Sequence, residues 1–151
     1  MSLQDSIMAA IKSAMKSKDA VALTALRSVK SAILIAHTSG SGSVMSEEDE
    51  FRLLQKLVKQ RHDSARIFSK QNRFDLAEPE LAEAEVISRF LPKMLDVSEV
   101  KKVVIDTIAS LGVSGMKDMG RVMGVVSKSL AGKTDGKTIA EVVTEINNTL
   151  T

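Results

Sequence analysis

Residues 46–71 read SEEDEFRLLQKLVKQRHDSARIFSKQ, and this stretch decides the fold class. Its apolar residues return every three or four positions, which is the period of a helix that buries one face. Ser46 and Asp49 resemble a capping box, in which each side chain accepts a hydrogen bond from the other residue's backbone N–H. The stretch therefore predicts a long helix that begins after Ser46 and continues to about Gln71.

The same helical period extends over the rest of the N-terminal part. It predicts a first helix near 3–17 and a second helix that Asp19 caps. Residues 38–46 are rich in Gly and Ser and are expected to form a flexible loop. A fourth helix is expected over 79–91, with Pro79 in its first turn, where a missing N–H costs nothing. No segment alternates polar and apolar residues in the manner of a strand.

The chain changes in character after Pro92, which stops the fourth helix. Six of the eight glycines lie in the last 40 residues, at positions 112, 115, 120, 124, 132 and 136. Three shorter helices fit there, over about 98–111, 116–130 and 137–149. Gly112 and Gly132 lie where helix C-caps belong, and Asp135-Gly136 is a turn before the last helix. We therefore expect an all-α protein, with a four-helix domain over 1–92 and a three-helix bundle over 97–151.

Composition excludes several kinds of site. The 151 residues include no Cys, two His, no Trp and no Tyr, and the formal net charge is +2. Disulfides, Cys-ligated zinc and thiol nucleophiles are excluded, and no metal or cofactor is expected. Gly132-Lys133-Thr134 mimics the end of a P-loop but lacks the preceding glycine and strand. We expect no catalytic residues in this chain.

The sequence also bears on the location of the protein. No stretch approaches ~18 uninterrupted apolar residues, so no membrane span is expected. The first residues match neither a signal peptide nor a mitochondrial presequence. We therefore expect a cytoplasmic protein without a membrane partner.

Bases gather along one face of the predicted helix at 46–71. Because they are spaced by threes, fours and sevens, they share one side of the helix: Arg52, Lys56, Lys59, Arg66 and Lys70. A row of phosphates can use such a face. Acids between 75 and 85 offer an alternative, because a fourth helix that folds back antiparallel would neutralise the row internally. Arg61 falls at the edge of the apolar face, and a glutamate of the fourth helix is its expected ion-pair partner.

A second basic surface is expected on the helix at 116–130. Gly120 and Gly124 lie one turn apart and form a smooth strip beside bases. Each glycine costs about 1 kcal/mol of helix stability against Ala, which favours a role in which another backbone comes close. That backbone belongs either to a neighbouring helix or to the sugar-phosphate chain of a ligand. The bases around the strip favour a polyanion: Lys117, Arg121, Lys128, Lys133 and Lys137.

Several motifs in order resemble the GatB/YqeY family. They are Lys59-Gln60-Arg61, the acidic run from Asp75 to Glu85, Phe90-Leu91-Pro92, Met116-Lys117-Asp118-Met119-Gly120-Arg121-Val122-Met123 and Gly132-Lys133-Thr134-Asp135-Gly136-Lys137. The C-terminal part is similar to the tail domain of GatB, the component of the tRNA-dependent amidotransferase whose tail contacts tRNA. Pro79 and Phe90 depart from the family pattern. The residues that match the tail are Lys117, Gly120, Arg121, Gly124, Lys133, Gly136 and Lys137.

The resemblance implies a YqeY-like binding module for tRNA or for an aminoacyl-tRNA-handling protein. The carbon–nitrogen ligase activity ascribed to the family, with glutamine as amido-N donor, belongs to GatB, whose catalytic parts have no counterpart in this chain. One alternative is a helical protein–protein adaptor that binds no nucleic acid. Another is an auxiliary of Glu-tRNA(Gln) or Asp-tRNA(Asn) amidation.

Overall fold

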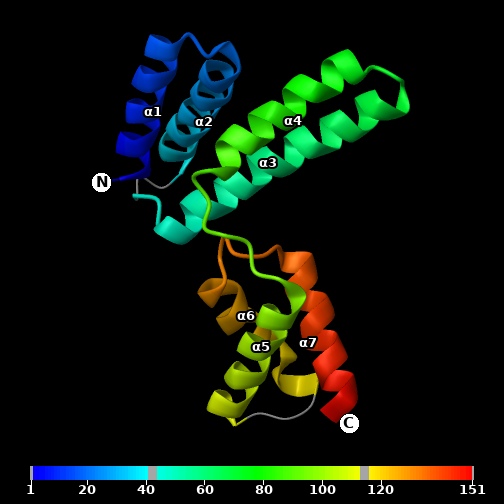
Figure 1. Ribbon diagram of the computed structural model, residues 1–151. Coiled ribbons are helices and arrows are strands. Elements are labelled where there is room, and N and C mark those ends of the chain that lie inside the picture. The colour runs from blue at the N-terminus through cyan, green and yellow to red at the C-terminus, as the bar shows by residue number, and fades with distance from the viewer. Residues whose placement is uncertain (1, 41–43, 113–115, 151) are drawn as a thin grey trace. The chain divides into compact units, whose positions relative to one another are not determined.

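The computed structural model describes residues 2–40, 44–112 and 116–150, and within them it contains only helices and connecting segments (Figure 1). The all-α prediction is confirmed. The elements in chain order are α1 (Leu3–Ser17), α2 (Ala20–Ser39), α3 (Glu47–Lys70), α4 (Phe74–Ser88), α5 (Val97–Leu111), the 3-10 helix η1 (Met116–Asp118), α6 (Met119–Ser129) and α7 (Gly136–Leu150). They divide into two compact units, Met1–Leu91 and Pro92–Thr151, called unit 1 and unit 2 below.

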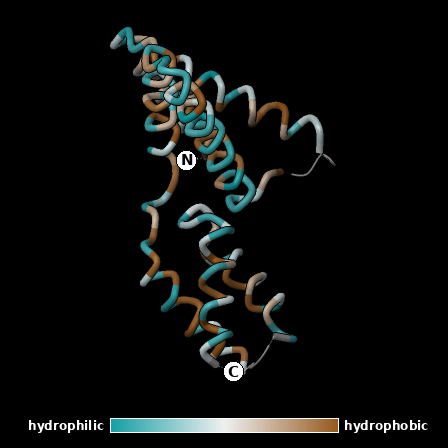
Figure 2. Tube along the Cα trace, turned by 90° about the vertical axis from the view of Figure 1, so that its right-hand side faces the viewer, coloured by the Kyte–Doolittle hydropathy of each residue, from teal (hydrophilic) through white to brown (hydrophobic). Residues whose placement is uncertain are grey.

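Unit 1 consists of the pair α1–α2 and the long hairpin α3–α4 (Figure 1). The apolar faces of all four helices meet in one core, whose largest fully buried side chains include Ile7, Leu26, Leu54 and Ile87. Figure 2 shows hydrophobic and hydrophilic residues interleaved along the chain, and the hydrophobic residues of the four helices supply this core. The long hairpin is therefore held to α1–α2 by apolar burial in the first half of α3 and at the end of α4, where Leu54 and Ile87 lie.

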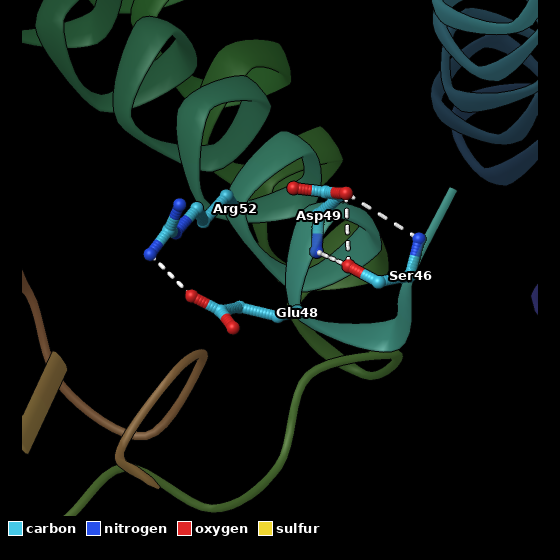
Figure 3. Close-up of polar contacts among 4 residues, drawn as sticks. All are labelled: Ser46, Glu48, Asp49 and Arg52. Atoms are coloured by element: carbon cyan, nitrogen blue, oxygen red, sulfur yellow. Dashed lines mark hydrogen bonds and ion pairs between the residues drawn. The ribbon is translucent and has the colours of Figure 1, made fainter. Parts of the chain in front are cut away.

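Polar caps fix where the helices of unit 1 begin. Asp19 accepts a hydrogen bond from the Ala22 N–H at 3.0 Å, as predicted for the start of α2. The predicted capping box at the start of α3 is also confirmed. Ser46 Oγ accepts from the Asp49 N–H at 3.1 Å, and Asp49 Oδ2 accepts from the Ser46 hydroxyl and N–H (Figure 3). These bonds satisfy N–H groups that a helix start leaves without intrahelical partners.

Two expected boundaries in unit 1 are wrong. The helix expected over 79–91 begins five residues earlier, at Phe74, and Pro79 lies inside α4 rather than in its first turn. Pro79 is exposed, so solvent can satisfy the carbonyl that its missing N–H leaves unpaired. The loop expected at 38–46 begins later, because α2 continues through Ser39, and residues 41–43 of it lie outside the described residues.

Among the described helices, α2 is long and apolar enough to cross a membrane by those two criteria alone. Its apolar face is occupied within unit 1, because Ala25, Leu26, Val29 and Ile33 are buried in the core. We therefore interpret α2 as a core helix.

Unit 2 packs α5, α6 and α7 around a second core. That core contains Val100 and Val104 of α5, Val122 and Val126 of α6, Leu130, and Ile139, Val142 and Val143 of α7. An ion pair between Lys101 Nζ and Glu145 Oε1, 2.9 Å apart, joins α5 to α7. The smaller core still places α6 firmly, because one side of that helix is buried between its two neighbours.

The segment before α5 belongs to this core as well. The Leu95 N–H donates to the Lys133 carbonyl at 2.8 Å, and the Leu95 side chain packs against the buried residues of unit 2. Asp96 caps α5 in a capping box with Glu99. Hydrogen bonds from the Ser98 hydroxyl and the Glu99 N–H hold the pKa of Asp96 below its ordinary value. The chain that enters unit 2 is thus fixed at two consecutive residues.

Two glycines were expected to cap helices of unit 2, and the structure confirms one of them. Gly112 is the C-cap of α5, with φ of 62°, in the left-handed conformation that glycine adopts without strain. The predicted C-cap at Gly132 is wrong, because α6 ends at Ser129 and its C-cap is Leu130. Gly132 instead forms the turn that follows, with φ of 79°. Gly115 lies outside the described residues.

Candidate nucleic-acid interface

Helix α6 presents one buried and one open side. Val122 and Val126 are buried, and the residues on the opposite side of the helix are exposed. Because α6 repeats every 3.6 residues, positions 120, 121, 124 and 128 recur on that exposed side. We call Gly120, Arg121, Gly124 and Lys128 the glycine surface. Lys117 precedes it in η1 and is also exposed.

The two glycines of this surface make no packing contact with the described part of unit 2. Within the described residues, no atom of another element lies within 4 Å of the position that a Cβ would occupy at Gly120 or Gly124. No helix described in unit 2 therefore packs against the strip. The space above both glycines is open, and a flat ligand can reach the helix backbone there.

The bases around the glycines are free to meet an anion. In the described part of the chain, no ion pair engages Arg121, Lys128 or Lys117. The residues of α6, Met119–Ser129, include no acid, and the N-cap Asp118 makes no ion pair within the described residues. Lys133 lies in the turn after α6 and Lys137 in the first turn of α7, and both are exposed. The structure thus leaves all five predicted bases of unit 2 accessible from solvent.

One member of this surface was not predicted from the sequence. Val125 is 42% exposed and lies between Arg121 and Lys128 along the open side. The helical period could have identified it, because Val122 and Val126 take the buried positions and leave Val125 outside. It adds an apolar contact of the kind that a ribose or base edge can cover.

The second basic surface, on α3, behaves differently. We call Arg52, Lys56, Lys59, Arg66 and Lys70 the α3 row; all five are exposed. Arg52 pairs with Glu48, one turn earlier on the same helix (Figure 3), and Arg66 pairs with Asp63. No ion pair joins the α3 row to α4 among the described residues. The expected neutralisation by the acids at 75–85 is formed only beyond the row, where Arg73 pairs with Asp75, with Nη2 and Oδ2 3.0 Å apart.

The ion pair expected for Arg61 is also absent from the described residues. Its guanidinium donates to Ser28 Oγ at 2.6 Å and to the Leu57 carbonyl at 3.2 Å, and Nε is buried without a partner. Burial raises the pKa of the Glu83 carboxyl on α4, and the charge of Arg61 opposes that rise. Arg61 therefore links α3 to α2 through a hydroxyl, because Ser28 lies within hydrogen-bond reach and no described carboxylate does.

Comparison with known protein families identifies a match over almost the whole chain. The model of a family described as Yqey-like protein matches residues 4–146. Three similar relatives are each named altered inheritance of mitochondria protein 41, mitochondrial. The relative from Clavispora lusitaniae is 37% identical over 92 residues, covering 61% of this chain and 53% of the relative.

The other two matches are longer and less similar. The relative from Pyrenophora tritici-repentis is 27% identical and covers 93% of this chain and 78% of the relative. The relative from Saccharomyces cerevisiae (strain YJM789) is 29% identical and covers 80% of this chain and 68% of the relative. The Clavispora match and a 42% identical match from Meyerozyma guilliermondii span about half the length of those relatives.

These names correct one expectation. The sequence led us to expect a cytoplasmic protein, whereas the similar relatives are named as mitochondrial proteins. The cytoplasmic assignment is therefore wrong. It relied on the composition of the first residues, and a chain that aligns with only part of some relatives carries no such information at its ends.

Proposed function

Because this chain belongs to the YqeY-like protein family, we propose that it binds tRNA through unit 2, with the glycine surface against the sugar-phosphate backbone. One observation carries the proposal. Gly120 and Gly124 open α6 to solvent, and the bases beside them make no ion pair within the described residues. A phosphate chain that comes this close to a helix gains both contact area and attraction to Arg121 and Lys128.

The contact reads the backbone of the RNA rather than its bases. Lys and Arg on an open helix face supply charge, and contacts to phosphate position a protein without reading sequence. Unit 2 has no aromatic residue for stacking. The resemblance to the tail domain of GatB makes tRNA the expected polyanion, and the names of the relatives support a mitochondrial setting.

A salt-dependent titration tests the proposal. The full chain is titrated with labelled tRNA at two salt concentrations, alongside a variant in which Lys117, Arg121 and Lys128 are replaced by Gln. We expect the wild-type affinity to fall steeply with salt, and the variant to bind several-fold more weakly. Its slope of log affinity against log salt should be smaller by roughly 2 to 3, since each lost phosphate contact removes just under one unit.

A matched control separates the surface from net charge. Lys12, Lys93 and Lys102 are exposed bases outside the glycine surface, and their replacement by Gln removes the same charge. This control variant should bind within about twofold of wild type, because it leaves Lys117, Arg121 and Lys128 in place. Equal losses in both variants, or tRNA binding no tighter than that of an unrelated duplex, would reject the assignment.

A protein-interaction adaptor remains the second candidate because of one feature of unit 1. Leu34 and Ile35 are neighbours on α2 and are 60% and 63% exposed. An apolar pair of this kind can anchor a protein partner. A partner that stays bound to the immobilised chain after nuclease treatment, and that is lost in Leu34→Ser/Ile35→Ser, would favour the adaptor.

An auxiliary role in amidation rests on the family resemblance alone. It predicts that the purified chain stimulates Glu-tRNA(Gln) amidation by the amidotransferase. Unchanged rates in the presence of excess chain would reject this role.

A further inference from the structure

The α3 row occupies the outward side of the long hairpin. Its members are spaced by four, three, seven and four residues, so they lie opposite the buried Leu54, Leu57 and Ala65. From Arg52 to Lys70 the row is about 27 Å long, at 1.5 Å of rise per residue. Such a length suits an extended chain of anions better than a single ion.

No acid of α4 makes an ion pair with the row within the described residues, because Asp75 pairs with Arg73 and Glu85 pairs with Arg89. Asp75, Glu78 and Glu85 are exposed, and the helices meet through apolar residues that include Ala77 and Ala84. The row's two ion pairs are formed within α3 and engage only its arginines. Lys56, Lys59 and Lys70 therefore make no ion pair within the described residues.

An exposed aromatic residue follows the row across the turn between α3 and α4, next to the ion pair of Arg73 and Asp75. Phe74, the first residue of α4, is 60% exposed, whereas the other three Phe residues of the chain are half-buried. A tight turn joins α3 to α4 (Figure 1), closed by a hydrogen bond from the Arg73 N–H to the Phe68 carbonyl at 2.9 Å. This turn holds Phe74 four residues beyond Lys70, on a rigid hairpin.

A line of cations that ends at an aromatic ring is the pattern of a single-stranded nucleic-acid surface, in which cations follow the phosphates and a base stacks on the ring. A duplex offers phosphates but keeps its base faces stacked. A membrane needs a continuous apolar helix side to insert. Leu54, Leu57 and Ala65 of α3 are buried, and Ile67 is the one large apolar residue of that helix that is exposed.

We propose that the α3 row and Phe74 form a binding surface for single-stranded nucleic acid, separate from the glycine surface of unit 2. Lys56, Lys59 and Lys70 contact the phosphates, and Phe74 stacks on one base. Because stacking accepts every base, this surface prefers unpaired strands without preferring a sequence.

The composition of the chain gives a direct measurement. There is no Trp and no Tyr, so Phe74→Trp introduces a single fluorophore at the proposed stacking position. Titration with a 12-nucleotide oligo(U) or oligo(dT) should quench the fluorescence of this introduced tryptophan in a saturable manner, and more weakly as salt rises. The matched reporter Met15→Trp, at a 57% exposed position of α1, should not change. Absence of quenching in Phe74→Trp, or equal quenching in both reporters, would overturn the proposal.

Charge variants on the Phe74→Trp background test the row. Replacing Lys56, Lys59 and Lys70 by Gln should weaken oligonucleotide binding about tenfold and lower the salt slope by about 2, at ~0.7 per lost contact with a single strand. Lys12, Lys16 and Lys30 are exposed on α1 and α2. Replacing these three by Gln should leave the oligonucleotide affinity within about twofold of wild type and the salt slope unchanged. Equal losses, or competition by a duplex as effective as that by a single strand, would refute the surface.

The test is independent of the function proposed for unit 2. The titration of Phe74→Trp is repeated in a chain that also carries Gln at positions 117, 121 and 128. Quenching should persist with an affinity within about threefold, because the two surfaces lie in different units. Loss of quenching in that chain would contradict a separate site. Unchanged far-UV circular dichroism in every variant excludes unfolding as the cause.

Discussion

The glycine surface of α6 and the α3 row are both exposed cationic sides of helices, yet they differ in how closely a ligand can approach the helix backbone. On α3, long side chains cover the helix, and Glu48 and Asp63 neutralise the two arginines of the row. On α6, no acid is present and two glycines leave the backbone open. Because electrostatic attraction falls with distance, closeness of approach separates the two surfaces as much as their charge does.

The largest expected effect comes from closing the space above the glycines without changing any charge. Gly120→Gln/Gly124→Gln should lower tRNA affinity about tenfold, because two side chains hold the phosphates away from α6. The same change should raise the free energy of unfolding of unit 2 by about 1 to 2 kcal/mol, since Gln is a far better helix former than Gly. Titration and thermal unfolding of the same sample measure both effects.

Opposite signs for affinity and stability are the decisive feature of that experiment. Gly120→Ala/Gly124→Ala provides a graded control, because one methyl group fills less of the open space, and its loss of affinity should be smaller. A fall in stability in either variant would mean that the glycines pack against something, and would undo the contrast with α3.

A smaller effect should follow from making the α3 row more like α6. Asp63→Asn releases Arg66 from its ion pair and should strengthen binding of a single-stranded oligonucleotide about twofold, measured by quenching on the Phe74→Trp background. The free energy of unfolding should change by less than about 1 kcal/mol, because exposed pairs contribute little. Glu78→Gln, an exposed acid of α4 outside any ion pair in the described residues, should leave affinity unchanged.

The smallest effect concerns the stability of the unit that carries α6. The capping hydrogen bonds lower the pKa of Asp96 in the folded state below its unfolded value of 3.8. The ionised carboxylate therefore stabilises unit 2 at pH values above that unfolded pKa. That stabilisation should be lost as pH falls from about 4 through the lowered folded value. Asp96→Asn keeps a capping oxygen but does not titrate, so its unfolding between pH 4 and pH 2 should vary less with pH than that of wild type.

Local chemistry could be predicted from the sequence because it acts over a few residues. Asp19, the Ser46 capping box and the Gly112 C-cap each depend on short-range hydrogen bonds or on one backbone conformation, and the structure confirms all three. Pro79 shows where such reasoning fails. Its preference for a first turn was outweighed by the packing of α4 against α3, which begins the helix at Phe74.

Interactions between helices were harder to predict. The partner of Arg61 depends on which side chain of α2 or α4 comes within reach, and helical period alone cannot select Ser28 over a glutamate. The sequence left two interpretations of Gly120 and Gly124, approach by a neighbouring helix or by a ligand, because composition cannot tell whether a helix covers them. Which bases are exposed could be predicted from the sequence, whereas their freedom from acids required the fold.

The bond between the Leu95 N–H and the Lys133 carbonyl has a practical consequence for chimaeric proteins. It ties the incoming chain to the turn that follows α6, and Asp96 next to it starts α5. A graft of the C-terminal bundle that begins at Val97 would discard both attachments and loosen the turn that carries Lys133. A graft that begins at Pro92 would keep the Leu95–Lys133 hydrogen bond and the Asp96 cap, so it is the fragment to fuse to an unrelated carrier.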